Sequence, residues 1–147
     1  MFKHILVPTD GSQFSQDSVR RAVSFAKDTG ARITAFYAKR EFRNPSYYTG
    51  GETSYLHPWE GEANEGKRAE EILGFVEHLC QEACVTCSKL TLTSNIVYDV
   101  IIEAASSSNC DLIFMASHGR RGLSALLLGS ETHKVLTHSK IPVLVHH

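Results

Sequence analysis

The chain lacks the features that mark several specialised classes of protein. Across its 147 residues no apolar run approaches the roughly 20 residues that a membrane helix needs. Fifteen basic residues nearly balance sixteen acidic ones, so charge gives no reason to expect nucleic acid or an anionic membrane as a partner. The N-terminus has no signal-peptide layout, because the apolar run that starts at Ile5 ends at Pro8. We therefore expect a soluble, cytoplasmic protein.

Cysteine is scarce as well. The four cysteines are too few and too clustered for a disulfide scaffold. Cys84-x2-Cys87 looks like half of a zinc or redox motif, but zinc would need two more close ligands. A thioredoxin-type site would lie near a strand-to-helix turn, whereas this pair follows a predicted helix. Cys80 precedes Cys84 by one helical turn, and we interpret both as structural thiols on the core or its rim.

The common nucleotide and hydrolase motifs are missing. There is no G-x-x-x-x-G-K-[ST], which excludes a P-loop, and no G-x-G-x-x-G follows a strand. A triad of Ser130, His118 and Asp10 is conceivable, but Ser130 is not in a G-x-S-x-G elbow and is better explained as a helix N-cap. We predict no catalytic residue and no dedicated metal ligands; the most that we expect is a slow ATPase.

Regular alternation of strands and helices is what the chain does contain. Apolar or alternating runs predict strands at 5–7, 32–38, 90–93, 112–115 and 142–145. Helical spacing predicts a first helix that follows a Ser12 cap and ends at Thr29-Gly30, and further helices at 63–83, 97–105 and 131–139. This order is typical of one α/β domain, residues 1–147, with a parallel sheet and helices on both faces.

One long segment interrupts this alternation. Residues 41–61 carry Asn44-Pro45, Gly50-Gly51 and His57-Pro58, so we predict a loop. It is long for a compact domain, which favours a lid, a binding segment or a partner surface. A mobile loop anchored by a few rings is the simpler alternative. Its aromatic residues are Phe42, Tyr47, Tyr48, Tyr55 and Trp59.

Unusual residues follow two of the predicted strands, at the edge of the sheet where ligands bind in such folds. The first strand runs into Asp10, and the fourth into Ser117-His118-Gly119 and then Gly129-Ser130 at a helix start. Glycines allow backbone N–H groups to approach an anion, and a helix N-terminus adds unpaired donors. The pattern predicts a phosphate site. Alternatively, the glycines serve only the turns, and Leu123 and Leu126–Leu128 form a turn of core helix.

The residues of the second loop resemble the universal stress protein family. Met-Ala-Ser-His-Gly-Arg-Arg-Gly is followed by Leu-Leu-Gly-Ser and by Ile-Pro-Val-Leu-Val, and the likeness extends over essentially the whole chain. ATP-binding members carry G-x2-G-x9-G-[ST]. This chain has Ala116-x2-Gly119-x9-Gly129-Ser130, so alanine replaces the first glycine.

The resemblance implies a fold, a ligand and an assembly. The fold would be like that of the adenine nucleotide alpha hydrolases, with strand order 3-2-1-4-5. The ligand would be ATP or AMP, with Mg²⁺ as a possible companion, in a stress-response or signalling protein. The assembly would be a homodimer through the last strand, Pro142 to Val145. The alternative is a nucleotide-free dimeric interaction protein of the same fold.

The same resemblance, taken with the loop chemistry, gives a set of candidate nucleotide-binding residues. Asp10 would lie on the ribose or base side and Tyr37-Ala38 near adenine. The full set is Pro8, Thr9, Asp10, Tyr37, Ala38, Met115, Ala116, Ser117, His118, Gly119, Arg120, Gly129, Ser130, Glu131 and Thr132.

Overall fold

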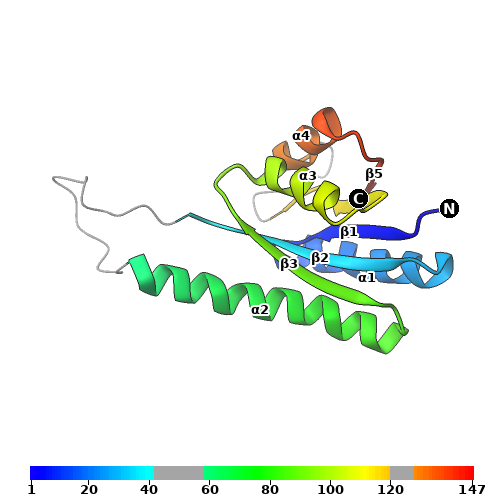
Figure 1. Ribbon diagram of the computed structural model, residues 1–147, viewed down its shortest axis with the longest axis horizontal. Coiled ribbons are helices and arrows are strands. Elements are labelled where there is room, and N and C mark those ends of the chain that lie inside the picture. The colour runs from blue at the N-terminus through cyan, green and yellow to red at the C-terminus, as the bar shows by residue number, and fades with distance from the viewer. Residues whose placement is uncertain (42–57, 120–127) are drawn as a thin grey trace.

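A computed structural model describes residues 1–41, 58–119 and 128–147. The elements in these ranges alternate as predicted, and Figure 1 labels them. In chain order they are β1 (His4–Pro8), α1 (Gln13–Thr29), β2 (Arg32–Lys39), α2 (Pro58–Ala83), β3 (Cys87–Thr93), α3 (Val97–Ser107), β4 (Leu112–Ala116), α4 (Ser130–His138) and β5 (Val143–His146).

The strands form one parallel sheet of five, in the order β3-β2-β1-β4-β5. The single α/β domain architecture and the strand order are therefore confirmed. β1 is central, and its Leu6 lies beside Thr34 of β2 and Ile113 of β4. β3 and β5 form the two edges of this sheet.

Helices cover both faces of the sheet, as predicted. Figure 1 shows α1 and α2 on one side, with α3 and α4 on the other. Successive strand residues point to opposite faces, so Ile5 and Val7 join the core beneath α1 and α2, whereas Leu6 joins the core beneath α3 and α4. No helix in the described ranges is long and apolar enough to cross a membrane.

The ends of α1 are those that the sequence predicts. The Ser12 hydroxyl caps the helix by accepting a hydrogen bond from the Ser15 N–H at 3.3 Å. Gly30 has φ +71°, and its N–H donates to the carbonyl of Ala26. Glycine ends the helix here because it adopts the left-handed conformation without steric cost.

The start of α2 corrects the predicted loop. The helix begins at Pro58, so the last four residues of the predicted loop, 58–61, are helical. Proline fits a first helical position, where its missing N–H costs nothing. The lid hypothesis and the rings of Phe42, Tyr47, Tyr48 and Tyr55 lie outside the described residues.

The start of the helix differs from the prediction in one further respect. Ala69, Leu73 and Val76 are buried at the predicted helical spacing, but Ala63, the first apolar residue of the predicted helix, is exposed. Glu65, which was not predicted on this face, is buried with them. A carboxylate therefore lies in this helix–sheet interface.

Three smaller expectations are also wrong. Gly129 is the N-cap of α4, so Ser130 is its first helical residue and not the cap. Leu128 is exposed and does not belong to a core helix; residues 123–127 lie outside the described residues. Cys84 is exposed, whereas Cys80 is fully buried, because Cys84 follows the last residue of α2 with a left-handed φ of 58°.

Candidate functional site

A pocket of about 470 Å³ opens at the carboxyl ends of the strands. Its walls come from the ends of β1, β2 and β4, the loop after β3, the first turn of α4 and Arg68 of α2. β1 leads into α1 on one face of the sheet, and the segment after β4 leads to α4 on the other face. Such a divergence leaves a crevice between neighbouring strand ends, which is where open parallel sheets bind ligands.

Asp10 lies on the floor of this crevice, directly after β1. Its Oδ1 accepts a hydrogen bond from the Ser12 N–H at 2.9 Å, and its own N–H donates to the Ser15 hydroxyl at 3.3 Å. A Cβ atom at Gly119 would lie 2.5 Å from Asp10 Oδ2. The carboxylate thus packs on the Cα of Gly119, and a side chain there would displace it.

Gly129 joins the start of α4 to the end of β4. Its N–H donates to the Ser117 carbonyl at 2.8 Å, and a Cβ atom at this position would lie 2.9 Å from that oxygen. The Thr132 hydroxyl makes a second tie by donating to the Ala116 carbonyl at 2.9 Å. These bonds place the first turn of α4, with its N–H groups and the positive end of its dipole, on the pocket wall.

The opposite wall rests on a buried carboxylate that the sequence analysis missed. Glu65 is 7% exposed, and its Oε2 accepts hydrogen bonds from the Tyr37 hydroxyl at 3.0 Å and the Arg40 N–H at 3.2 Å. Tyr37 and Arg40 both line the pocket. Glu65 therefore links α2 to the end of β2. Its spacing of four residues from Ala69 was the signal in the sequence, because it places Glu65 on the same helix face as Leu73 and Val76.

The structure brings most of the predicted site residues together on this pocket. Ser117 and Gly129 do not line it, and Arg120 lies outside the described residues. The Ser117 Oγ instead shares hydrogen bonds with Nδ1 of His118 at 2.9 Å and Nδ1 of His147 at 3.1 Å. The predicted residues on the pocket are Pro8, Thr9, Asp10, Tyr37, Ala38, Met115, Ala116, His118, Gly119, Ser130, Glu131 and Thr132.

Further pocket residues were not predicted from the sequence. Ser94 and Asn95 follow β3 and obey the same strand-end rule that identified Asp10, so they could have been found. Arg40 and Arg68 bring two guanidinium groups to the lining. The remaining unpredicted lining residues are Ser15, Phe36, Val97 and Ile101.

Two polar side chains near α4 on the pocket, His118 and Glu131, differ in their hydrogen bonds. His118 is 8% exposed, and its Nε2 is buried without a hydrogen-bond partner among the described residues. Glu131 reaches across to α3, where its Oε2 accepts a hydrogen bond from the Tyr98 N–H at 2.9 Å.

In the described ranges no group of three His, Cys, Asp or Glu side chains is arranged to hold a metal ion.

Comparison with known proteins agrees with this architecture. A sequence profile of the Universal stress protein family matches residues 1–147. The chain belongs to this family. Universal stress protein MJ0531 of Methanocaldococcus jannaschii is 31% identical to it over 145 residues, which cover 99% of this chain and 82% of the relative.

Solved structures of other universal stress proteins have the same fold. One, in complex with cAMP, superimposes with a TM-score of 0.73 at 22% identity, covering 99% of this universal stress protein and 97% of the solved chain. Another, a family member from Arabidopsis thaliana with AMP bound, superimposes with a TM-score of 0.67 at 16% identity. The match covers 97% of this chain and 90% of the solved chain.

Proposed function

We propose that this universal stress protein binds an adenine nucleotide, ATP or AMP, in the pocket at the carboxyl ends of its strands, and acts in stress response or signalling. The observation that carries the proposal is the convergence of Asp10, Gly119 and the first turn of α4, which are far apart in the sequence, on one pocket. The ligands of the two solved relatives, cAMP and AMP, favour the same ligand class.

Each wall of the pocket suits a different part of such a nucleotide. The N–H groups of residues 130–132 open α4, where helical donors have no partner within their own helix, and they would hold the phosphates. Asp10 would repel phosphates but accepts hydrogen bonds from ribose hydroxyls. The base would then lie against Tyr37 and Ala38 at the end of β2. Arg40 and Arg68 add positive charge that favours an anionic ligand.

Magnesium remains a prediction that rests on the family resemblance. The described residues contain no cluster of three metal-binding side chains, and we assign no protein ligand to the ion. When bound to ATP, Mg²⁺ would neutralise part of the phosphate charge.

Isothermal titration tests the proposal directly. The full chain is titrated with ATP, with and without Mg²⁺, and separately with AMP. We expect saturable heat with at least one of them. The absence of heat at millimolar nucleotide, with circular dichroism showing folded protein, would reject the proposal and favour a nucleotide-free interaction protein. Mass spectrometry of the purified protein adds an independent readout, since a co-purified nucleotide would be seen directly.

Gly119→Val gives a matched test of the site. A side chain at Gly119 clashes with the Asp10 carboxylate, so we expect affinity to fall about 10- to 100-fold, corresponding to an overpacking cost of ~1–3 kcal/mol. Gly66→Val is the control, because a Cβ atom there meets nothing within 4 Å. Unchanged affinity in Gly119→Val would show that the pocket is not the nucleotide site.

We further propose that the protein is a homodimer that pairs through β5. This strand forms one edge of the sheet, and its four residues are half-buried in the single chain. An apolar edge with free backbone groups favours pairing with another strand. Sedimentation of Val145→Lys should show monomer, whereas Leu136→Lys, a change at an exposed apolar residue of α4, should leave the dimer intact. The cytoplasmic location stays a prediction.

A further inference from the structure

Three of the four cysteines gather where α2 ends and β3 begins. Cys80 lies in the last turn of α2 and is fully buried. Cys84 is exposed just beyond the helix, and Cys87, half-buried, is the first residue of β3. All are free thiols. This cluster lies at the opposite end of the strands from the proposed nucleotide site, because β3 runs from Cys87 toward Ser94 on the pocket.

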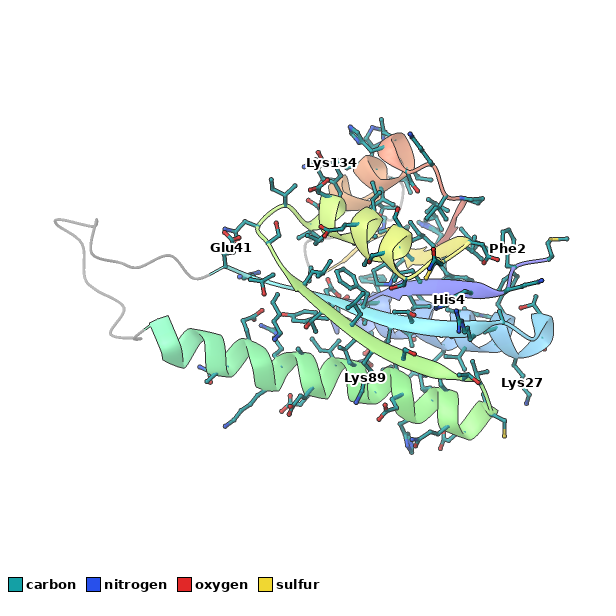
Figure 2. All side chains as sticks on the ribbon, viewed as in Figure 1. Phe2, His4, Lys27, Glu41, Lys89 and Lys134 are labelled. Atoms are coloured by element: carbon teal, nitrogen blue, oxygen red, sulfur yellow. The ribbon has the colours of Figure 1, made fainter. Side chains whose placement is uncertain are left out.

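The side chain of Cys87 faces α2. Lys89, labelled in Figure 2, lies two residues further along β3 and therefore on the same face. It forms an ion pair with Glu77 of α2 at 3.2 Å. Glu77 precedes Cys80 by three residues, so Cys80 lies on the same side of the helix, close to the level of Cys87. Cys87 packs against the apolar core that contains Cys80. The two thiols therefore face each other across the helix–strand interface.

The two thiols differ in exposure and in pKa. A hydrogen bond from the Cys80 thiol lowers the pKa of Cys87. The same interaction, together with burial, raises the pKa of Cys80. The half-buried Cys87 is thus the sulfur that ionises first and reacts as a nucleophile, while Cys80 keeps its proton beside it.

The other two cysteines lack this arrangement. Cys84 is turned outward by its left-handed backbone at the end of α2. Cys110 belongs to the core beneath α3 and α4, on the other face of the sheet, and burial raises its pKa to about 11. Cys84 therefore serves as an accessible but unpaired control for the reactivity of Cys87.

We propose that Cys80 and Cys87 form a dithiol site that reacts with hydroperoxides and closes an intramolecular disulfide between α2 and β3. The Cys87 thiolate attacks one oxygen of hydrogen peroxide, the O–O bond breaks, and hydroxide leaves and is protonated to water. Cys87 becomes a sulfenic acid. The Cys80 sulfur then attacks the Cys87 sulfur, the S–O bond breaks, and the departing hydroxide leaves as water with the Cys80 proton. Two thiols lose two electrons, and one peroxide is reduced to two waters.

The experiment exposes the folded full-length protein to hydrogen peroxide, quenches it with catalase and blocks remaining thiols with an alkylating reagent. Peptide mapping without reduction should find residues 80 and 87 in one disulfide, two hydrogens lighter than the dithiol. Treatment with dithiothreitol should restore both thiols. Cys84→Ser should form the same bond at an unchanged rate. Absence of the bond in the wild type, or a bond that joins Cys84 instead, would overturn the proposal.

Trapping the intermediate gives a second test. In Cys80→Ala the disulfide between residues 80 and 87 cannot form, so a dimedone-type probe should label a sulfenic acid at Cys87 and do so faster than at Cys84. Cys87→Ser is the complementary variant, in which Cys80 should stay reduced. Circular dichroism verifies that each variant is folded. Labelling of Cys84 alone in folded Cys80→Ala would contradict the role of Cys87.

Discussion

At the scale of single residues, Glu65 shows how a carboxylate can support a ligand pocket without lining it. It accepts hydrogen bonds from the Tyr37 hydroxyl and the Arg40 N–H, and it is almost entirely removed from water. Both donors belong to the pocket wall at the end of β2. The side chain therefore fixes this wall relative to α2, because buried polar groups are costly to leave without their partners.

We predict that Glu65→Ala lowers the free energy of unfolding by about 1–3 kcal/mol, since two hydrogen bonds to a buried carboxylate are lost. Urea unfolding measures the change. Glu70→Ala is the control, because Glu70 is an exposed acid of the same helix and should alter stability by less than about 0.5 kcal/mol. Equal effects of the two variants would contradict the role assigned to Glu65.

Substitutions at two glycines should have opposite effects on stability, one through close packing and the other through helix propensity. A methyl group at Gly129 would meet the backbone oxygen of Ser117 at 2.9 Å, whereas one at Gly74, inside α2, would meet nothing within 4 Å. We expect Gly129→Ala to destabilise the protein by about 1–3 kcal/mol. Gly74→Ala should stabilise it by about 0.5–1 kcal/mol, because alanine favours the helix. Thermal unfolding of both variants checks the opposite signs.

At the scale of elements, α3 begins without a cap of its own. Ile96 occupies the N-cap position and provides no side-chain hydrogen bond. The missing acceptor comes from α4, where Glu131 binds the Tyr98 N–H in the first turn of α3. A carboxylate at a helix N-terminus is also favoured by the helix dipole. One side chain thus joins two helices at the edge of the pocket.

Glu131→Ala should therefore lower the free energy of unfolding by about 0.5–2 kcal/mol, the usual cost of a lost N-cap. Glu131→Gln retains an acceptor oxygen and should lose less. Glu103→Ala, at an exposed acid of α3, should have little effect. Chemical denaturation of the three variants gives the comparison, and a Glu103→Ala effect as large as that of Glu131→Ala would refute the cap.

At the scale of the whole molecule, stability depends on a buried histidine at the end of the strands opposite the pocket. His4 opens β1, is 8% exposed and shares a hydrogen bond between its Nε2 and the Thr34 hydroxyl at 2.7 Å. Burial, assisted by the charge of Arg32, lowers the pKa of His4 in the folded state, although Asp111 opposes the shift. The unfolded chain therefore takes up a proton near pH 6.5 that the folded protein does not.

We predict that the free energy of unfolding falls as pH decreases from about 6.5 toward the lower folded pKa of His4, and is fully retained above that range. Urea unfolding at several pH values from about 7.5 to about 5, the range in which histidine changes its charge, measures this dependence. His4→Gln should flatten it. His133→Gln, at an exposed histidine of α4, should leave the slope unchanged. An equal slope in His4→Gln and the wild type would exclude His4 as the cause.

Local signals in the sequence determined the elements and much of the pocket's membership. Short apolar runs marked the strands, and Ser12 and Gly30 marked the ends of α1, because capping and periodicity act within one or two turns of chain. The strand-end rule predicted that Asp10 and the segment after β4 would lie together at the carboxyl ends of the strands. The strand order came from the family resemblance, and not from periodicity.

Only the tertiary structure decided which side chains meet. The packing of α2 on the sheet buries Glu65, exposes Ala63 and brings Cys80 toward Cys87. Helical spacing marked the apolar face of this helix but not the contacts that the face makes. Gly119 and Gly129 remain predicted to approach a phosphate, and the structure adds a role that the sequence did not indicate, close approach of Asp10 and of the Ser117 backbone. The physical reason is the same in each case: these contacts join segments far apart in the chain, so their energies depend on packing rather than on neighbouring residues.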